Sequence, residues 1–239
     1  MVLRQRNRQV LSERFSQEEL DACTGIVEEA ETLLQRGGKS STPENSKDRW
    51  GNPTLAKEQE SILEKWAKDR GIWLENTTEA LQRHFGEVYA RGGEATVFLS
   101  KDCTKVYKEI ELTYYVEPQL ALDRIVLHNL LTDKEASLKL LGFGRNAEKS
   151  FVLIVEQPFV QGGPASQEEI VSFMIGMGFM PYSNNTEFSN GDLLVGDLHD
   201  ENIIKTNNGG FAIIDADYRI NTPNYGLGGK RTTKKRHSF

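Results

Sequence analysis

Apolar and polar positions follow two different periods along the chain, and the change between them falls near residue 86. Before that point apolar residues recur at helical spacing. Helices are predicted there over residues 16–36, 54–69 and 78–84. Ser16 and Glu19 form a capping box at the start of the first helix. Turn formers and charges fill residues 37–53, so we predict an N-terminal helical arm and linker, residues 1–53, separate from the main body.

After residue 86 the pattern changes to short runs typical of β-strands. Three antiparallel strands are predicted over residues 87–91, 95–99 and 105–108. Later hairpins are predicted over residues 138–157, 179–192 and 203–214. Helices are predicted over residues 118–131 and 166–177. The run Phe151–Val155 is wholly apolar, as a central strand should be. Together these elements predict an α+β fold.

The helix predicted over residues 118–131 is apolar around most of its surface, so we expect it to be buried. Asp123 falls inside the apolar arc, and Arg124 falls on the narrower polar side. A buried carboxylate is costly unless it is paired. Asp123 is therefore expected either to meet a cation or to bond to a group one helical turn away.

Composition and charge narrow the possible functions. The chain has 239 residues, 38% of them hydrophobic, and a net charge of -6. It is long enough for a sizeable core, and its charge argues against nucleic-acid binding except for contacts from the basic ends, residues 1–8 and 230–237. No apolar run approaches a membrane span. Cys23 and Cys103 lie far apart, so a cytoplasmic protein is expected.

Candidate chemistry is concentrated near the C-terminus. Asp197 is followed five residues later by Asn202, and Asp215 comes directly after a predicted tight hairpin. Carboxylate and amide oxygens are ligands that Mg²⁺ prefers. Asn202 and Asp215 are therefore candidate metal ligands, and Asp217 could be a second carboxylate ligand or a surface residue.

The segment Gly196-Asp197-Leu198-His199, with Asn202 after it, resembles the catalytic loop of the protein-kinase-like superfamily. The His two residues after the Asp is similar to the form in aminoglycoside phosphotransferases. The nearest resemblance is to the compact kinase-like domain of polyvalent proteins from phages and conjugative elements, which carries a segment similar to Leu122–Asn129. This resemblance covers roughly residues 87–218.

The resemblance implies roles for the residues of this loop. Asp197 would orient or deprotonate a substrate hydroxyl, and Asn202 and Asp215 would hold Mg²⁺. His199 would either help at the γ-phosphate of ATP or brace the loop through a hydrogen bond. The cofactors implied are ATP and Mg²⁺.

The resemblance also implies a nucleotide site on the predicted strands. Gly92 and Gly93, with Val97 four residues later, resemble a reduced glycine-rich loop that would cover the ATP phosphates. Lys108 would steady the α- and β-phosphates. Its acidic partner would be Asp123 or, as an alternative, Glu117.

Residues after the apolar strand resemble the hinge whose backbone meets adenine in kinase-like folds. Glu156 and Phe159 are the candidate contacts. Pro158 has no N–H, so an amide contact would come from a neighbour such as Phe159 or be absent. We predict an N-lobe with its preceding helices over residues 54–157 and a reduced C-lobe with the basic tail over residues 158–239.

Three functions remain open at this point. The first is an ATP- and Mg²⁺-dependent serine/threonine/tyrosine protein kinase of a mobile element. The second is a small-molecule kinase of the aminoglycoside-phosphotransferase type, and the third is a non-catalytic nucleotide-binding module. The presence of Lys108, Asp197, Asn202 and Asp215 together argues against the third. The partner would be an unknown protein or a small molecule with a hydroxyl group.

Overall fold

The computed structural model describes residues 26–34, 53–115 and 117–221. The predicted capping box, most of the linker, Cys23 and both basic ends lie outside these residues. Within the described parts of the chain, no helix combines the length and the apolar character needed to cross a membrane.

The helices lie close to where periodicity predicts them. Their bounds are residues 26–34, α3 Pro53–Asp69, α4 Thr77–Phe85, α5 Pro118–Leu131 and α6 Gln167–Gly176, and a 3-10 turn, η2, spans Leu112–Tyr114. Local signals fix their ends. Ser166 and Glu169 form a capping box at the start of α6, and Pro118 occupies the first position of α5, where its missing N–H costs nothing.

A six-stranded sheet forms the first half of the molecule. Its strands are β1 Trp73–Leu74, β2 Ala90–Arg91, β3 Ala95–Leu99, β4 Lys105–Glu111, β5 Lys139–Arg145 and β6 Phe151–Pro158, in the order β1-β5-β6-β4-β3-β2. Only β1 pairs in parallel, with β5. The glycine at position 144 lets β1 approach β5 closely, since a Cβ on Gly144 would lie 2.3 Å from the carbonyl oxygen of Leu74. β4 runs beyond the predicted 105–108 because its pairing with the apolar β6 continues to Glu111.

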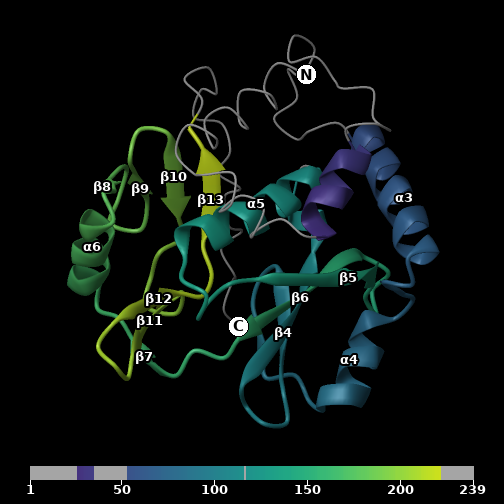
Figure 1. Cartoon of the computed structure of the whole chain (residues 1–239), viewed down its shortest axis with the longest axis horizontal. Coiled ribbons are helices and arrows are strands. Elements are labelled where there is room, and N and C mark those ends of the chain that lie inside the picture. The colour runs from purple at the N-terminus through teal and green to yellow at the C-terminus, as the bar shows by residue number, and fades with distance from the viewer. Residues whose placement is uncertain (1–25, 35–52, 116, 222–239) are drawn as a thin grey trace, which may run out of the picture.

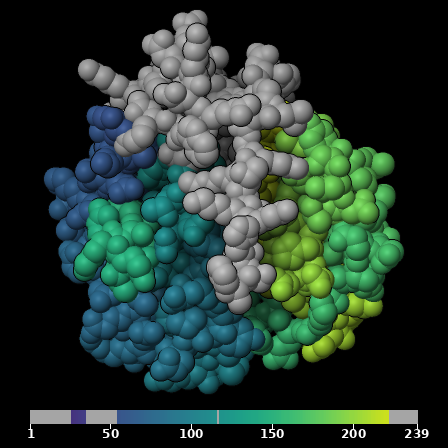
Figure 2. Space-filling view, turned by 180° about the vertical axis from the view of Figure 1, so that it is seen from behind, coloured from purple at the N-terminus to yellow at the C-terminus, as the bar shows by residue number. Residues whose placement is uncertain are grey.

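Two smaller sheets form the second half, together with α6. One has the order β13-β10-β9-β8 and the other β12-β11-β7. Their strands are β7 Gly162–Pro164, β8 Met180–Pro181, β9 Phe188–Ser189, β10 Leu193–Gly196, β11 Ile203–Thr206, β12 Phe211–Ile213 and β13 Asp217–Ile220. Figure 1 shows this half on one side of the molecule, and Figure 2 shows the same division from behind.

The two halves have separate apolar cores, and α5 takes part in both. Leu122, Ile125 and Val126 belong to the first core, together with residues of β5 and β6. Leu127, on the same helix, belongs to the second core with residues of α6 and β10. The prediction that α5 is buried is confirmed, and the helix runs between the halves (Figure 1).

The helix at residues 26–34 packs into the first core. Val27, Ala30 and Leu34 are no more than 2% exposed, and they share a cluster with residues of α3 and α5. An ion pair between Glu29 and Arg70 adds a polar contact. Over these residues the predicted arm is not separate from the main body, because an amphipathic helix buries its apolar face wherever a partner face is available.

Candidate active site

The predicted catalytic loop joins β10 to β11. Asp197 directly follows β10 with a backbone φ of +62°, a left-handed conformation that few non-glycine residues adopt and that often marks functional sites. The next residue, Leu198, is fully buried, and its N–H donates to the carbonyl oxygen of Thr186. This anchor leaves the Asp197 side chain 68% exposed. Surrounding protein atoms raise the pKa of Asp197, and His199 opposes that shift.

The side chain of Asn202 bonds back to Asp197, at the start of this loop. Its Nδ2 donates to the backbone oxygen of Asp197 at 2.7 Å and lies 3.2 Å from Asp197 Oδ2. The same nitrogen lies 3.1 Å from Nε2 of His199. The geometry therefore suits His199 as a residue that braces the loop, which is one of the two roles predicted for it.

Asp215 lies beside this loop, as the predicted hairpin requires. The N–H groups of Ile214 and Asp215 approach the Asn202 carbonyl oxygen at 2.9 and 3.4 Å. β11 and β12 form the antiparallel pair that returns the chain to this point. Burial alone would raise the pKa of the Asp215 carboxyl, but the charges of Lys108 and Arg124 outweigh it and hold the pKa below its usual value.

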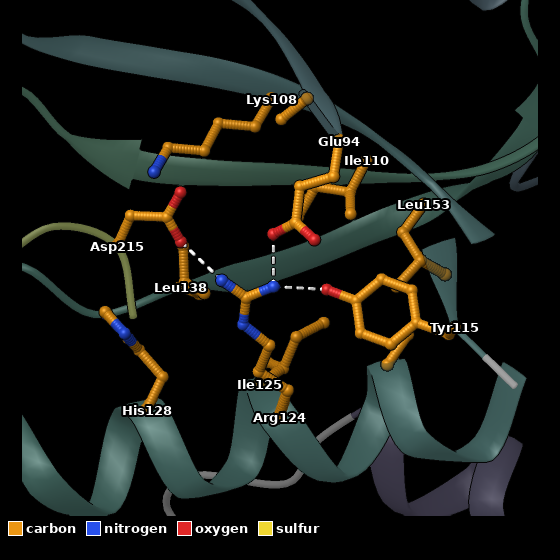
Figure 3. Close-up of a pocket in the computed structure, with 12 residues that line it drawn as sticks. Glu94, Lys108, Ile110, Tyr115, Arg124, Ile125, His128, Leu138, Leu153 and Asp215 are labelled. Atoms are coloured by element: carbon orange, nitrogen blue, oxygen red, sulfur yellow. Dashed lines mark hydrogen bonds and ion pairs between the residues drawn. The ribbon is translucent and has the colours of Figure 1, made fainter. Parts of the chain in front are cut away.

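Lys108 extends from the centre of the six-stranded sheet toward Asp215 (Figure 3). In the sheet it pairs with Val97 on β3 and Val155 on β6. Its Nζ donates to the backbone oxygen of Ile214 at 2.9 Å. Burial lowers the pKa of Lys108, and the nearby Asp215 carboxylate opposes that effect. The lysine therefore joins the two halves of the molecule at the candidate site.

The predicted acidic partner of Lys108 is wrong. Asp123 accepts a hydrogen bond from Gln119, one helical turn earlier, and Glu117 accepts one from Gln59. Among the described residues neither acid forms an ion pair with Lys108. Asp123 therefore bonds to a side chain one helical turn away, which was the alternative predicted for it. The polar side of α5, which carries Arg124, faces the candidate site instead.

Arg124 is the residue of this site that the sequence reasoning missed. Its Nη2 donates to Asp215 Oδ1 at 2.6 Å, and its Nε donates to the backbone oxygen of Ala216 at 2.7 Å. Its Nη1 donates to both Glu94 and the Tyr115 hydroxyl (Figure 3). The signal in the sequence is an arginine on the narrow polar side of a mostly apolar helix.

Glu94 follows the glycine pair and points into the site. The N–H of Gly92 donates to the Ala95 oxygen at 2.8 Å, which closes a tight turn. Gly92 and Gly93 are exposed at its tip. Beneath the turn lies a cavity of about 20 Å³, room for about one water molecule. Its polar lining consists of Glu94, Lys108, Tyr115, Arg124, His128 and Asp215.

The predicted adenine contacts are engaged elsewhere. The Phe159 N–H donates to the carbonyl oxygen of Thr104 at 2.8 Å, so the expected hinge amide is already used. Glu156 lies inside the sheet, between β4 and β5, and its carboxylate accepts bonds from Lys105 and Tyr107. Both differences have one cause, because the pairing of β4 with β6 continues to Pro158.

A second unpredicted feature is the buried His128 on α5. Its Nε2 donates to the Ala136 oxygen at 2.8 Å, and the Tyr218 hydroxyl lies 3.2 Å from its Nδ1. Burial lowers the pKa of His128 to about 4, so the ring is neutral near pH 7. Gln157 also donates to Ala136, at 2.7 Å, and to Ile214, at 3.2 Å. The bond to Ile214 holds the backbone directly before Asp215.

The arrangement fits a magnesium ion that shares its ligands with a nucleotide. Nδ2 of Asn202 bonds to Asp197, which leaves the amide oxygen of Asn202 as the atom that could bind a metal. Asp215, whose backbone N–H approaches the Asn202 carbonyl oxygen, could supply a carboxylate ligand. In the part of the chain that the structure describes, no three His, Cys, Asp or Glu side chains group as a metal site. Mg²⁺ suits such a place because it keeps waters and phosphate oxygens among its ligands.

Comparison with known families decides the assignment of the chain. The model of a family described as "Serine/Threonine/Tyrosine Kinase found in polyvalent proteins" matches residues 56–222, which is more than half of the chain. The chain belongs to this family. The polyvalent-protein kinase family is the one that the sequence resembles, so that prediction is confirmed. No curated protein matches the chain.

Membership of the polyvalent-protein kinase family agrees with the mixed α/β architecture. The match begins within α3 and ends just after β13, so it includes Lys108, the Asp197 loop and Asp215. It leaves out the helix at residues 26–34. The finer likeness of residues 196–202 to aminoglycoside phosphotransferases stays a prediction, as do the individual roles of the site residues.

Proposed function

We propose that this protein is a kinase that transfers the γ-phosphoryl group of ATP, with Mg²⁺, to a serine, threonine or tyrosine hydroxyl of another protein. One observation carries the proposal. An exposed carboxylate, Asp197, is held by the amide of Asn202, and Asn202 is joined through its backbone to Asp215. Family membership supports the same activity. In this proposal the two halves of the fold act as the two lobes of a kinase.

The reaction needs a base for the hydroxyl proton and a holder for the phosphates. Asp197 accepts the proton of the substrate hydroxyl, whose oxygen then bonds to the γ-phosphorus while the bond to the β–γ bridging oxygen breaks and ADP leaves. The raised pKa of Asp197 makes it a better base than an ordinary aspartate. Asn202 keeps Asp197 in place through their 2.7 Å bond.

Asn202 and Asp215 would hold the metal, which when bound offsets the negative charge of the phosphates. Lys108 lies between the sheet and Asp215 and would hold phosphate oxygens near the metal ligands. Gly92 and Gly93, at the exposed tip of their turn, would let backbone N–H groups approach the phosphates.

A protein is the favoured substrate over a small molecule. The Asp197 side chain is exposed. The loop beside it lies between β8 and β9 and contains Thr186, whose carbonyl oxygen accepts from the N–H of Leu198. Within the described residues no added helical subdomain encloses this face. An open carboxylate suits a chain segment that lies across the surface. The occurrence of the family in polyvalent proteins supports the proposal that this kinase belongs to a mobile element.

The test is transfer of label from γ-labelled ATP, with Mg²⁺, to proteins of a cell lysate. Asp197→Ala and Asp215→Ala should each lose roughly 10²-fold or more of the activity. Asp200→Ala is the matched control, because Asp200 is 69% exposed on the same loop and has no assigned role. Equal label with wild type and both site variants would refute the proposal. ATP turnover that needs a metabolite pool instead of protein would favour the small-molecule kinase.

A further inference from the structure

The α5 helix places a cation, and not an acid, at the candidate nucleotide site. Arg124 has a side chain only 14% exposed. Its guanidinium contacts Glu94 after the glycine pair, Asp215, and the backbone of Ala216. Lys108 approaches the same carboxylate from the sheet (Figure 3). Two buried cations therefore converge on Asp215 from opposite elements.

The charges in this cluster balance in a way that bears on phosphate binding. Lys108 and Arg124 carry two positive charges, and Glu94 and Asp215 carry two negative ones. Of these two acids, Glu94 belongs to the glycine turn, and its side chain is 31% exposed. A carboxylate that sits on a guanidinium occupies the place where a phosphate oxygen would bind, because both anions fit the arginine fork.

The size of the cavity under the glycine turn also indicates that Glu94 occupies a place that a phosphate could take. The cavity under the glycine turn holds about 20 Å³, far less than a chain of phosphates needs. Glu94 lines it together with both cations. A phosphate oxygen that binds Nη1 of Arg124 would have to replace the Glu94 carboxylate there. Gly92 and Gly93 precede Glu94 directly, and their conformational freedom allows the turn to move.

We propose that Arg124 is a second phosphate-binding cation of the nucleotide site, and that Glu94 is the built-in carboxylate that a nucleotide phosphate displaces from it. The inference rests on the proposed function for the presence of a nucleotide. It adds two residues to that site, from α5 and from the glycine turn. The bonds of Arg124 to Ala216 and Asp215 stay in place and aim the guanidinium at the phosphates.

The first test measures equilibrium binding of a non-hydrolysable ATP analogue and of adenosine by calorimetry, without Mg²⁺. Arg124→Leu should weaken analogue binding roughly ten- to a hundredfold, the usual effect of losing a charged hydrogen bond. Adenosine binding should stay within about twofold, because adenosine has no phosphate. Arg124→Lys should restore part of the loss, since it keeps the charge but not the fork.

A matched control separates the phosphate contact from general damage. Arg145 is also a partly buried arginine, paired with Glu64 at 3.1 Å on the first half of the molecule. Arg145→Leu should bind both ligands as wild type does. If Arg124→Leu loses adenosine as strongly as the analogue, or binds the analogue as wild type does, the inference is wrong.

Glu94→Gln tests the inference without removing the buried arginine. This variant keeps the shape of the side chain but removes the charge that competes with phosphate. It should bind the analogue about two- to fivefold more tightly, as expected for the loss of a partly exposed ion pair, and bind adenosine unchanged. Glu64→Gln is its control. Weaker analogue binding by Glu94→Gln would show that Glu94 supports the site, and would overturn the inference.

These outcomes are distinct from those of the proposed function. Binding of the analogue that depends on Arg124, without any transfer of label, would sink the kinase proposal and leave this inference standing. Transfer of label, together with analogue binding that is unchanged in the Arg124 and Glu94 variants, would support the kinase proposal and overturn this inference. A wild-type protein that binds no nucleotide would overturn both.

Discussion

Between pH 7.5 and 5.5, acid should destabilise this protein through the buried side chain of His128. The residue is 2% exposed, and burial lowers its pKa to about 4. An unfolded histidine titrates near 6.5. Between these two values the unfolded chain binds a proton that the folded chain does not, so the free energy of unfolding falls as the pH drops below 6.5. The loss is about 1.4 kcal/mol at pH 5.5, and about 3 kcal/mol across the whole window.

The effect has a structural cause that a variant can isolate. Protonation would place a charge on the ring nitrogen that faces the Tyr218 hydroxyl, near the charges of Lys108 and Arg124. His128→Gln lacks the titrating group. Both proteins would be unfolded with urea at pH 7.5 and at pH 5.5. His84 and His199 are present in both, so the difference between the proteins reports His128 alone.

Wild type should lose about 1.4 kcal/mol more than His128→Gln between the two pH values. The variant is expected to be less stable than wild type at pH 7.5, because two buried bonds are altered, but that offset does not enter the comparison. An equal loss in the two proteins would refute the reasoning, because it would mean that the folded protein accommodates a charged ring at position 128.

Three further predictions concern packing and buried hydrogen bonds. Thr77→Val removes a hydroxyl that donates to the buried carboxylate of Glu109, so urea denaturation should show a loss of about 1–3 kcal/mol; an unchanged midpoint would count against the bond. Gly144→Ala places a Cβ 2.3 Å from the Leu74 oxygen, whereas Gly163→Ala meets nothing within 4 Å. Only Gly144→Ala should lower the melting temperature, because overpacking there should reduce the free energy of unfolding by about 1–3 kcal/mol. Leu34→Ala should cost about 2–5 kcal/mol in the same denaturation assay if residues 26–34 belong to the core, and a neutral result would contradict that packing.

Sequence alone predicted the elements of this fold well where local physics determines them. The range Pro118–Leu131 matches α5 at both ends, because a proline at the start and a continuous apolar surface are local signals. The turn before Phe211 was likewise predictable from its Asn and Gly residues. Strand ends were less predictable, and β4 continues to Glu111 because its partner strand does.

The candidate site was predictable in its motifs but not in its contacts. Asp197, Asn202 and Asp215 lie together as their spacing indicates. A helical projection describes one element at a time, however, and it cannot show what lies opposite each face. It gave Arg124 the polar side of α5, which is correct, but it could not show that this side faces Asp215 and Ala216.

The helix at residues 26–34 has a practical consequence for isolating the catalytic unit. The family match begins at residue 56, yet Val27 and Leu34 complete the core behind α5. A fragment trimmed to the matched residues would expose apolar side chains of α3 and α5 to water, which favours aggregation. Fragments that begin before residue 26 are therefore the better choice for expression. The boundary of a shared sequence and the boundary of a folding unit differ here by about thirty residues.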